Sequence, residues 1–113
     1  MQIVKQWLSG EAVKALAEEV GGTICVVVDV RRGLLVASGT PHPAGVRQLT
    51  ADGSRREDLW GVTYRPGQAL GRRVEYTARI NEEHPANQRQ PVIQDPAVVE
   101  QVQAVLVKCL GGA

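Results

Sequence analysis

The sequence predicts an α+β domain, in which an antiparallel sheet of about four to five strands carries N- and C-terminal helices on one face. Three observations indicate this class. Apolar residues recur at spacings of three and four near the two chain ends, in residues 11–20 and 96–110. Segments 23–30 and 34–38 are short, apolar and β-branched, which is typical of strands. Segment 73–81 alternates apolar and mostly charged residues, as a strand with one solvent-facing side does.

The 113 residues are expected to form a single domain spanning residues 1–113. A chain of this length can bury one substantial core but has little room for a second. The apolar residues are mainly Val, Leu, Ile and Ala, with two Trp, two Tyr and no Phe. We therefore expect a core made of branched aliphatic side chains.

The chain is expected to be soluble and cytoplasmic. No apolar run approaches the ~20 residues that a membrane helix needs, and the N-terminus has no signal-peptide pattern. Cys25 and Cys109 lie in apolar contexts and are expected to be reduced thiols, which fits a cytosolic protein.

The N-terminal part is expected to form a strand, a helix and a hairpin. A short strand within residues 1–8 comes first, and Ser9 is placed to cap the helix at 11–20. Segment 23–30 is apolar on both faces, which predicts the central strand of the sheet. A three-residue connection containing glycine then returns the chain through 34–38 as its hairpin partner.

The middle of the chain has two competing interpretations. Ser54 and Glu57 have the spacing of a capping box, which predicts one or two helical turns after the serine. Alternatively, Asp52-Gly53 forms a two-residue hairpin turn that joins 46–50 to 59–63. The helical interpretation is favoured because Glu57 lies where the box requires it, while 46–50 by itself fits either helix or strand.

The C-terminal part is expected to contain two strands, a long polar connection and the last helix. Residues 62–64 predict a strand, and Arg65-Pro66-Gly67 has the order of a type II turn. Segment 82–94 is polar and contains prolines, a pattern that indicates a functional or mobile loop. Asp95 is placed to cap the last helix, with Pro96 at its first position.

The charge of the chain is unevenly distributed. All ten arginines lie between Arg31 and Arg89 together with six acidic residues, which leaves this part with a charge of +4. Three lysines and six acids lie outside it, and the whole chain carries +1. Arginine binds carboxylate and phosphate through a planar, bidentate contact, so the middle of the chain is a candidate anion-binding surface. The simpler account is a compositional preference for arginine, with solvated side chains.

We expect a ligand-binding region where the polar loops of this middle part meet. Its predicted residues are His42, Asp58, Trp60, Arg79, His84 and Arg89. Both histidines begin a His-Pro-Ala tripeptide, and repeated turn chemistry is the simplest account of that pattern. The functional interpretation is that the two loops place both imidazoles and the carboxylate around a ligand. The indole is suited to stacking on a base or sugar, although a tryptophan that follows a leucine is usually part of the core.

Asp29 ends a strand that is expected to be buried, so its carboxylate needs partners such as Arg31 or Arg79. No spacing of His and Cys resembles a zinc site, and no P-loop, G-x-G-x-x-G, G-x-S-x-G or C-x-x-C motif occurs. We therefore expect no metal and no cofactor, and it stays open whether the protein is an enzyme.

Several motifs resemble a family of short uncharacterised bacterial proteins catalogued as a domain of unknown function. They are V-V-V-D-V, Gly39 and His42, D-G-S-R-R-E-D-L-W-G, Pro66-Gly67, Ile80-Asn81 and I-Q-D-P at 93–96. The family signature D-G-S-x-x-E-D-L-W-G, with the histidine upstream, is the most specific part, and the resemblance covers nearly the whole chain. It implies a bacterial, cytosolic, single-domain protein and supplies no reaction.

The chain departs from the family pattern at two places. The pattern has His-Ala-Asp where this chain has His42-Pro43-Ala44, and Asn-Ile-Arg-Pro where this chain has residues 81–84. An acid and an arginine of the pattern are therefore missing. If these two residues form a site in relatives, this chain has lost it or rebuilt it with His84 and Arg89.

The leading hypothesis is a non-catalytic homodimer that binds an anionic small molecule or RNA through the predicted ligand-binding region. One alternative is a small hydrolase or nuclease with His42 as general base and Asp58 orienting it, which requires the two side chains within hydrogen-bond reach. The other alternative is a structural or partner-binding homodimer, suggested by the apolar last helix and by a sheet face left partly uncovered.

Overall fold

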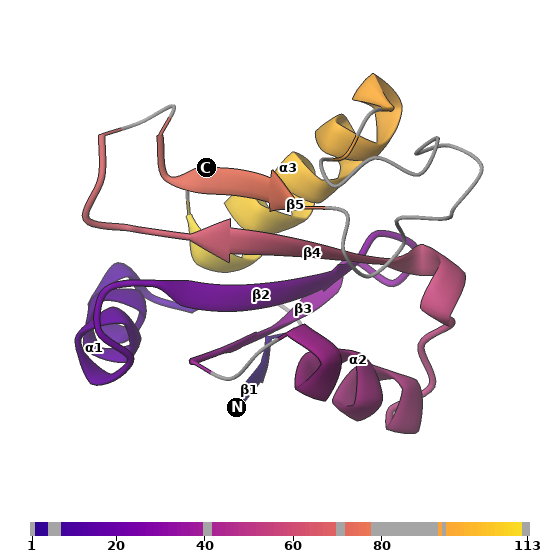
Figure 1. The fold of residues 1–113 in the computed structure, drawn as a ribbon, viewed down its shortest axis with the longest axis horizontal. Helices are drawn as coiled ribbons and strands as arrows, with labels where there is room; N and C mark the ends of the chain where they lie inside the picture. Colours follow the sequence, from indigo (N-terminus) through magenta and orange to yellow (C-terminus); the bar gives the residue numbers. More distant parts are fainter. Residues whose placement is uncertain are drawn as a thin grey trace.

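The computed structural model describes residues 2–4, 8–39, 42–69, 72–77, 93 and 95–111. These residues form a five-stranded antiparallel sheet with helices packed against it (Figure 1), which confirms the predicted α+β class. In chain order the elements are β1 (Gln2–Val4), α1 (Gly10–Glu19), β2 (Ile24–Asp29), β3 (Leu34–Ser38), α2 (His42–Ala51), the 3-10 turn η1 (Arg56–Asp58), β4 (Leu59–Tyr64), β5 (Val74–Thr77) and α3 (Pro96–Leu110).

The strands lie in the order β1-β3-β2-β4-β5, so β2 is central as predicted. Val28 of β2 is opposite Leu35 of β3 on one side and Trp60 of β4 on the other. The predicted hairpin of β2 and β3 is present, and β4 begins three residues earlier than the predicted strand at 62–64. Of segment 73–81, residues Val74–Thr77 form β5, and the residues after them lie outside the described part.

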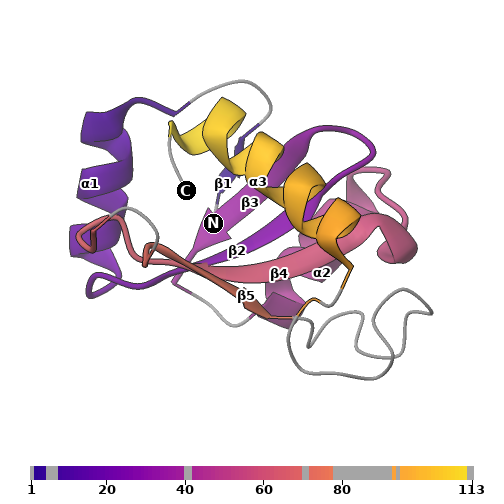
Figure 2. The same ribbon diagram turned by 90° about the horizontal axis from the view of Figure 1, so that it is seen from above.

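Helices α1 and α3 pack into one core cluster with the same face of the sheet, as predicted. Figure 2 shows α3 lying across this face and α1 beside it at one end of the sheet. The cluster contains every second residue of β2 (Ile24, Val26, Val28), the alternate residues of β4 including Trp60, and the apolar faces of both helices. Every second side chain of a strand points to the same face of the sheet, and helix side chains three or four positions apart share one face of the helix. The cluster therefore collects one face of each element.

Helix α2 covers part of the opposite face of the sheet (Figure 2), and it begins at His42, where the sequence predicted a turn. Val46 and Leu49 of α2 pack on Val27 of β2 and Val36 of β3 in a second buried cluster. Among the described residues, Val107 is the one large hydrophobic side chain that is exposed, at 51%. A single exposed valine is ordinary for a protein surface.

The predicted helix termini are confirmed. The Ser9 hydroxyl accepts a hydrogen bond from the backbone N–H of Ala12 at 3.1 Å, and the Asp95 carboxylate accepts one from Ala97 at 2.9 Å. Pro96 occupies the first turn of α3, where its missing N–H costs no helical hydrogen bond. Gly111 ends α3 with φ +79°, a conformation that favours glycine.

Both interpretations of the middle segment are wrong in part. Residues 46–50 belong to α2, so Asp52-Gly53 does not join two strands. The 3-10 turn η1 is the only helical part after Ser54 in this segment, and it has no side-chain cap. The Ser54 hydroxyl instead donates to the Asp29 carboxylate at 2.6 Å. The same hydroxyl accepts from Arg32 at 2.8 Å, so both of its hydrogen bonds are charge-assisted and stronger than a bond to a neutral helix N–H.

Candidate functional site

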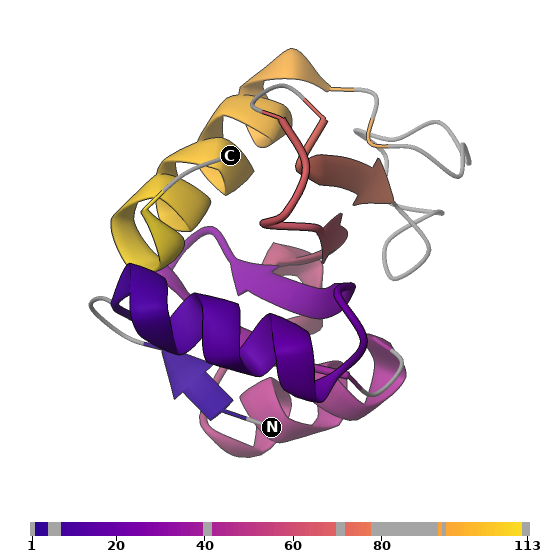
Figure 3. The same ribbon diagram turned by 90° about the vertical axis from the view of Figure 1, so that its left-hand side faces the viewer.

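A groove of about 1100 Å³ lies at the end of the sheet where β2 begins and β4 ends. Its walls are α1, the turn between α1 and β2, the turn that follows β4, and the last turn of α3. Figure 3 views this end of the molecule, with α1 in front and the end of α3 close to it. We call it the α1–α3 groove, and the side chains that line it include Val13, Lys14, Ala17, Glu18, Tyr64, Arg65, Arg73 and Leu110.

Backbone hydrogen bonds hold the walls of the groove in place. The N–H of Leu8, just before α1, donates to the carbonyl of Cys109 in α3 at 2.7 Å, which ties the start of one helix to the end of the other. The N–H of Arg65 donates to the carbonyl of Arg73 at 2.7 Å and closes the loop between β4 and β5. Arg73 Nε then donates to the carbonyl of Gln68 at 2.8 Å across that loop. These hydrogen bonds connect the elements that form the walls of the groove.

The floor of the groove is apolar. Val13 and Ala17 come from α1, Leu110 from α3 and Tyr64 from the end of β4, and all four are buried. Val13 and Ala17 lie four residues apart and so share one face of α1. Tyr64 brings a phenol whose pKa is raised by burial, and the neighbouring Arg73 offsets part of that rise.

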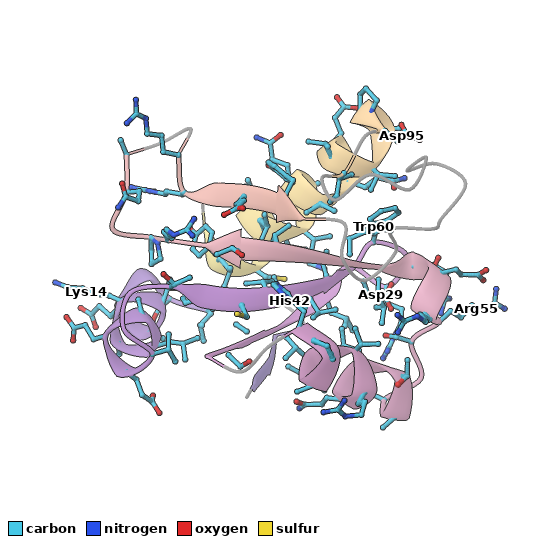
Figure 4. The ribbon with its side chains drawn as sticks, in the orientation of Figure 1. Lys14, Asp29, His42, Arg55, Trp60 and Asp95 are labelled. Atoms are coloured by element: carbon cyan, nitrogen blue, oxygen red, sulfur yellow. The ribbon has the colours of Figure 1, made fainter. Side chains whose placement is uncertain are left out.

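The rim of the groove carries three cationic side chains and one acid. Arg65 forms an exposed ion pair with Glu75 at 3.3 Å. Arg73 contacts the Tyr64 hydroxyl and lies on the same loop. Lys14 is exposed, extends outward from α1 (Figure 4), and forms no ion pair with a residue in the described part. Glu18 is the single acid among the residues that line the groove, so the rim is net positive.

The residues that the sequence predicts for the ligand site do not line this groove where they are described. His42 Nε2 is hydrogen-bonded to the carbonyl of Val62 at 2.8 Å, so it donates to a backbone acceptor. Asp58 accepts from Arg31 Nε at 2.9 Å. Trp60 is 2% exposed and lies in the core beneath α3, which agrees with the simpler account of this residue. The other three predicted residues lie outside the described part of the chain: Arg79, His84 and Arg89.

The hydrolase alternative requires a hydrogen bond between His42 and Asp58, and these two side chains are engaged elsewhere. Asp58 immediately precedes β4, whereas His42 meets that strand at Val62. Four residues of strand separate the two points, which is about 13 Å at the usual rise per residue. The described structure therefore does not support a dyad of these two residues.

Asp29 lies at the opposite end of β2 from the groove and is completely buried. Its Oδ1 accepts from the backbone N–H groups of Arg31 and Arg32, both at 2.9 Å, and its Oδ2 accepts from Ser54. Arg32 also donates to Ser54 at 2.8 Å and to Asp52 at 2.9 Å. The predicted partnership with Arg31 thus exists through its backbone. We call this group the Asp29 network; its hydrogen bonds join the turn after β2 to the chain that follows α2.

Fold and groove together define a class: a small α+β domain with an apolar-floored and basic-rimmed groove at one end of an antiparallel sheet. The chain belongs to the family described as "Protein of unknown function (DUF5674)", whose model matches residues 2–109. This agrees with the resemblance to a family of unknown function noted from the sequence. Comparison with curated proteins and with solved structures produced no match.

Sequence reasoning missed Lys14 and Arg73 as members of a site. Arg73 is predicted only as part of the charged face of a strand, and Lys14 lies in the predicted helix 11–20 without any assigned role. A signal was present, because Arg65 follows the predicted strand 62–64, Arg73 begins the next predicted strand, and Lys14 adjoins Val13 in the apolar stripe of α1. What no pattern could supply is that these two elements meet at the end of α3. In the described part, no group of three metal-ligating side chains lies together, and no helix is long and apolar enough to span a bilayer.

Proposed function

We propose that this protein is a binding domain for an anionic small molecule, and that the α1–α3 groove is its binding site. The observation that carries the proposal is the groove itself, in which an apolar floor lies beneath Lys14, Arg65 and Arg73. Small-molecule sites are typically concave, mostly apolar and equipped with a few placed polar groups. The ligand class agrees with the anion binding that the arginine-rich middle of the chain predicts, at a different place in the fold.

The charges on the rim favour a ligand with negative charge. Lys14 has no ion-pair partner among the described residues, and Arg65 has only an exposed one, with Glu75. An exposed ion pair contributes little free energy, so a ligand anion can replace Glu75 at low cost. Arg73 is held by Gln68 and Tyr64, which presents its guanidinium in a defined orientation. A held guanidinium loses less side-chain entropy when it binds a carboxylate.

Thermal shift screening of the full chain with small carboxylates, phosphates and nucleotides, followed by calorimetry of the hits, tests the proposal. A binding anion should raise the melting temperature and bind about three- to ten-fold more weakly to Lys14→Gln and to Arg73→Gln, since each variant removes one favourable charge. Lys14→Gln is the cleaner variant, because the lysine makes no ion pair with a described residue. Arg73→Gln also removes a bond to the β4–β5 loop.

The matched control is Arg47→Gln, which removes one positive charge from an exposed position on α2, against the other face of the sheet. It should leave affinity unchanged. Equal weakening by Arg47→Gln would mean that binding follows net charge and not the groove. If no anion among these classes binds the wild-type protein, the proposal is wrong.

Four further statements remain predictions from the sequence: a homodimer, RNA as the ligand, a cytoplasmic location and a bacterial source. The free thiols of Cys25 and Cys109 support a reducing compartment. Sedimentation velocity at several concentrations tests the dimer, and a gel-shift assay with single-stranded RNA tests RNA binding. Hydrolase activity through His42 has no supporting observation and is not proposed.

A further inference from the structure

We infer that the ligand of the α1–α3 groove is an amphiphilic monocarboxylate, an acid with one negative charge and an aliphatic or aromatic body. This inference rests on the proposed function and names its ligand class. The competing class is the polyanion, such as a nucleotide or pyrophosphate, which also needs cationic groups. The floor of the groove and the helix ends around it distinguish the two classes.

The floor favours a ligand with an apolar body. Val13, Ala17, Leu110 and the ring of Tyr64 present carbon to the groove and belong to the main core cluster. A hydrated polyanion would cover these side chains without burying apolar surface of its own. An aliphatic chain laid on them removes its own apolar surface from water, together with the small area that these side chains still expose, which is favourable in proportion to the area buried. The groove volume of about 1100 Å³ is ample for such a chain.

The helix ends disfavour several negative charges. The groove is lined by Gly111 at the C-terminal end of α3 and by Gly21 and Gly22 just after α1. A helix C-terminus carries partial negative charge on its unpaired carbonyl groups, and Glu18 adds a full one. Phosphate-binding sites use helix N-termini instead. The three cationic side chains are opposed by Glu18 and by the partial negative charges of two helix C-termini. The positive charge that is left suits a ligand with a single carboxylate.

The two ends of such a ligand have separate partners. The carboxylate would pair with the guanidinium of Arg73 or Arg65, which offer a planar fork of donors. The apolar body would then extend over Val13 and Ala17 along α1, whose polar side begins at Lys14. Lys14 on the outer rim attracts the carboxylate of the ligand over a longer distance. It makes no contribution to binding the apolar body of the ligand.

Calorimetry of the full chain with acetate, butanoate, hexanoate and octanoate, at concentrations below micelle formation, tests this assignment. Affinity should rise about two- to four-fold for each CH₂ added, as burial of that group predicts. Octan-1-ol and octylammonium, which have the same body without the negative charge, should bind at least about ten-fold more weakly than octanoate. Pyrophosphate and ADP should bind more weakly than octanoate as well.

The outcomes separate the inference from the proposed function. If butanoate and octanoate bind equally, or if pyrophosphate or ADP binds most tightly, the proposed anion binding stands and the assignment of an amphiphilic ligand is wrong. If no anion binds, both are wrong. If octan-1-ol binds as tightly as octanoate, the groove binds apolar molecules whether or not they are charged. The assignment of a carboxylate ligand is then wrong.

A pair of matched variants locates the body of the ligand. Val13→Thr replaces a methyl group of the floor by a hydroxyl and should weaken octanoate about three-fold or more while leaving acetate unchanged. Val98→Thr makes the same change in the same core cluster, on α3 and away from the groove, and should leave both unchanged. Equal effects of the two variants would contradict the assignment.

Methyl NMR of the wild-type protein gives an answer that does not depend on variant folding. Octanoate should shift the methyl signals of Val13, Ala17 and Leu110. Signals of Leu49, which lies on the opposite face of the sheet, should not move. Shifts at Leu49 without shifts at Val13 would overturn the site.

Discussion

Ser54 and Asp29 show how a single buried carboxylate organises its surroundings. Asp29 is fully buried and accepts three hydrogen bonds, two of them from the backbone of the turn that follows β2. Ser54 is 8% exposed, donates to Asp29 and accepts from Arg32. No buried side-chain nitrogen or oxygen in the described part lacks a partner. The β2–β3 turn is thereby joined to the chain between α2 and β4, two segments far apart in sequence.

Replacing Ser54 by alanine should lower the free energy of unfolding by about 1–3 kcal/mol, because the buried Asp29 side chain loses one of its three hydrogen-bond donors. Urea denaturation followed by circular dichroism measures this change. A double-mutant cycle with Asp29→Asn should give a coupling free energy of at least about 0.5 kcal/mol. Simple additivity of the two substitutions would mean that the hydrogen bond is of no energetic consequence.

At the scale of elements, α2 approaches the sheet through a glycine. A Cβ built at Gly45 would lie 2.7 Å from a methyl carbon of Val27, and Val27 is buried in the central strand. No φ in the left-handed region is involved at this position, so glycine is required by space alone. The close approach lets Val46 and Leu49 reach the sheet and form the second core cluster.

Gly45→Ala should lower the free energy of unfolding by about 1–3 kcal/mol through overpacking, even though alanine is a better helix former by about 1 kcal/mol. Gly10→Ala is the matched control, since Gly10 is also helical and a Cβ there meets nothing within 4 Å. The control should be neutral or stabilising in the same urea denaturation. Equal stabilisation at both positions would show that α2 can move away from the sheet at little cost.

At the scale of the whole molecule, burial raises the pKa of four side chains that ordinarily titrate in alkali. They are the thiols of Cys25 and Cys109 and the phenols of Tyr64 and Tyr76. For Cys109 the neighbouring Lys108, and for Tyr64 the neighbouring Arg73, offset part of the rise. The folded protein therefore keeps these protons to higher pH than the unfolded chain does.

Stability should be insensitive to these groups at neutral pH and should fall as pH rises past the ordinary thiol pKa of 9.0, and further past the phenol value of 10.0. The sign follows because the unfolded chain releases its protons first, and deprotonation then favours unfolding. Thermal melts from pH 7 to 10.5 under reducing conditions measure the decline. Cys25→Ala should make the decline near pH 9 shallower, and a melting temperature that stays constant up to pH 10.5 would contradict the expectation.

Local patterns determined most of the elements. Ser9, Asp95 and Pro96 place helix starts through hydrogen bonds within a few residues, so capping chemistry can be recognised in the sequence alone. The apolar run at residues 23–30 indicates a strand buried on both faces, and β2 is central for that reason. Family membership also follows from the sequence, because the family model compares sequence alone.

Long-range contacts decided the rest. Residues 46–50 suit helix or strand equally, and in the structure they belong to a helix that packs Val46 and Leu49 against the sheet, with Gly45 next to Val27. Ser54 and Glu57 have the spacing of a cap, yet Ser54 points to Asp29, 25 residues earlier, because a buried carboxylate must be hydrogen-bonded.

The candidate site shows the same division between sequence and tertiary structure. The sequence by itself determined the class of fold, the helix termini and the central strand. The groove was decided only by tertiary structure: α1, the β4–β5 loop and the end of α3 meet through contacts such as Leu8 with Cys109. Periodicity and capping depend on residues that are a few positions apart in the sequence. A groove exists only where segments that are distant in the sequence pack side by side.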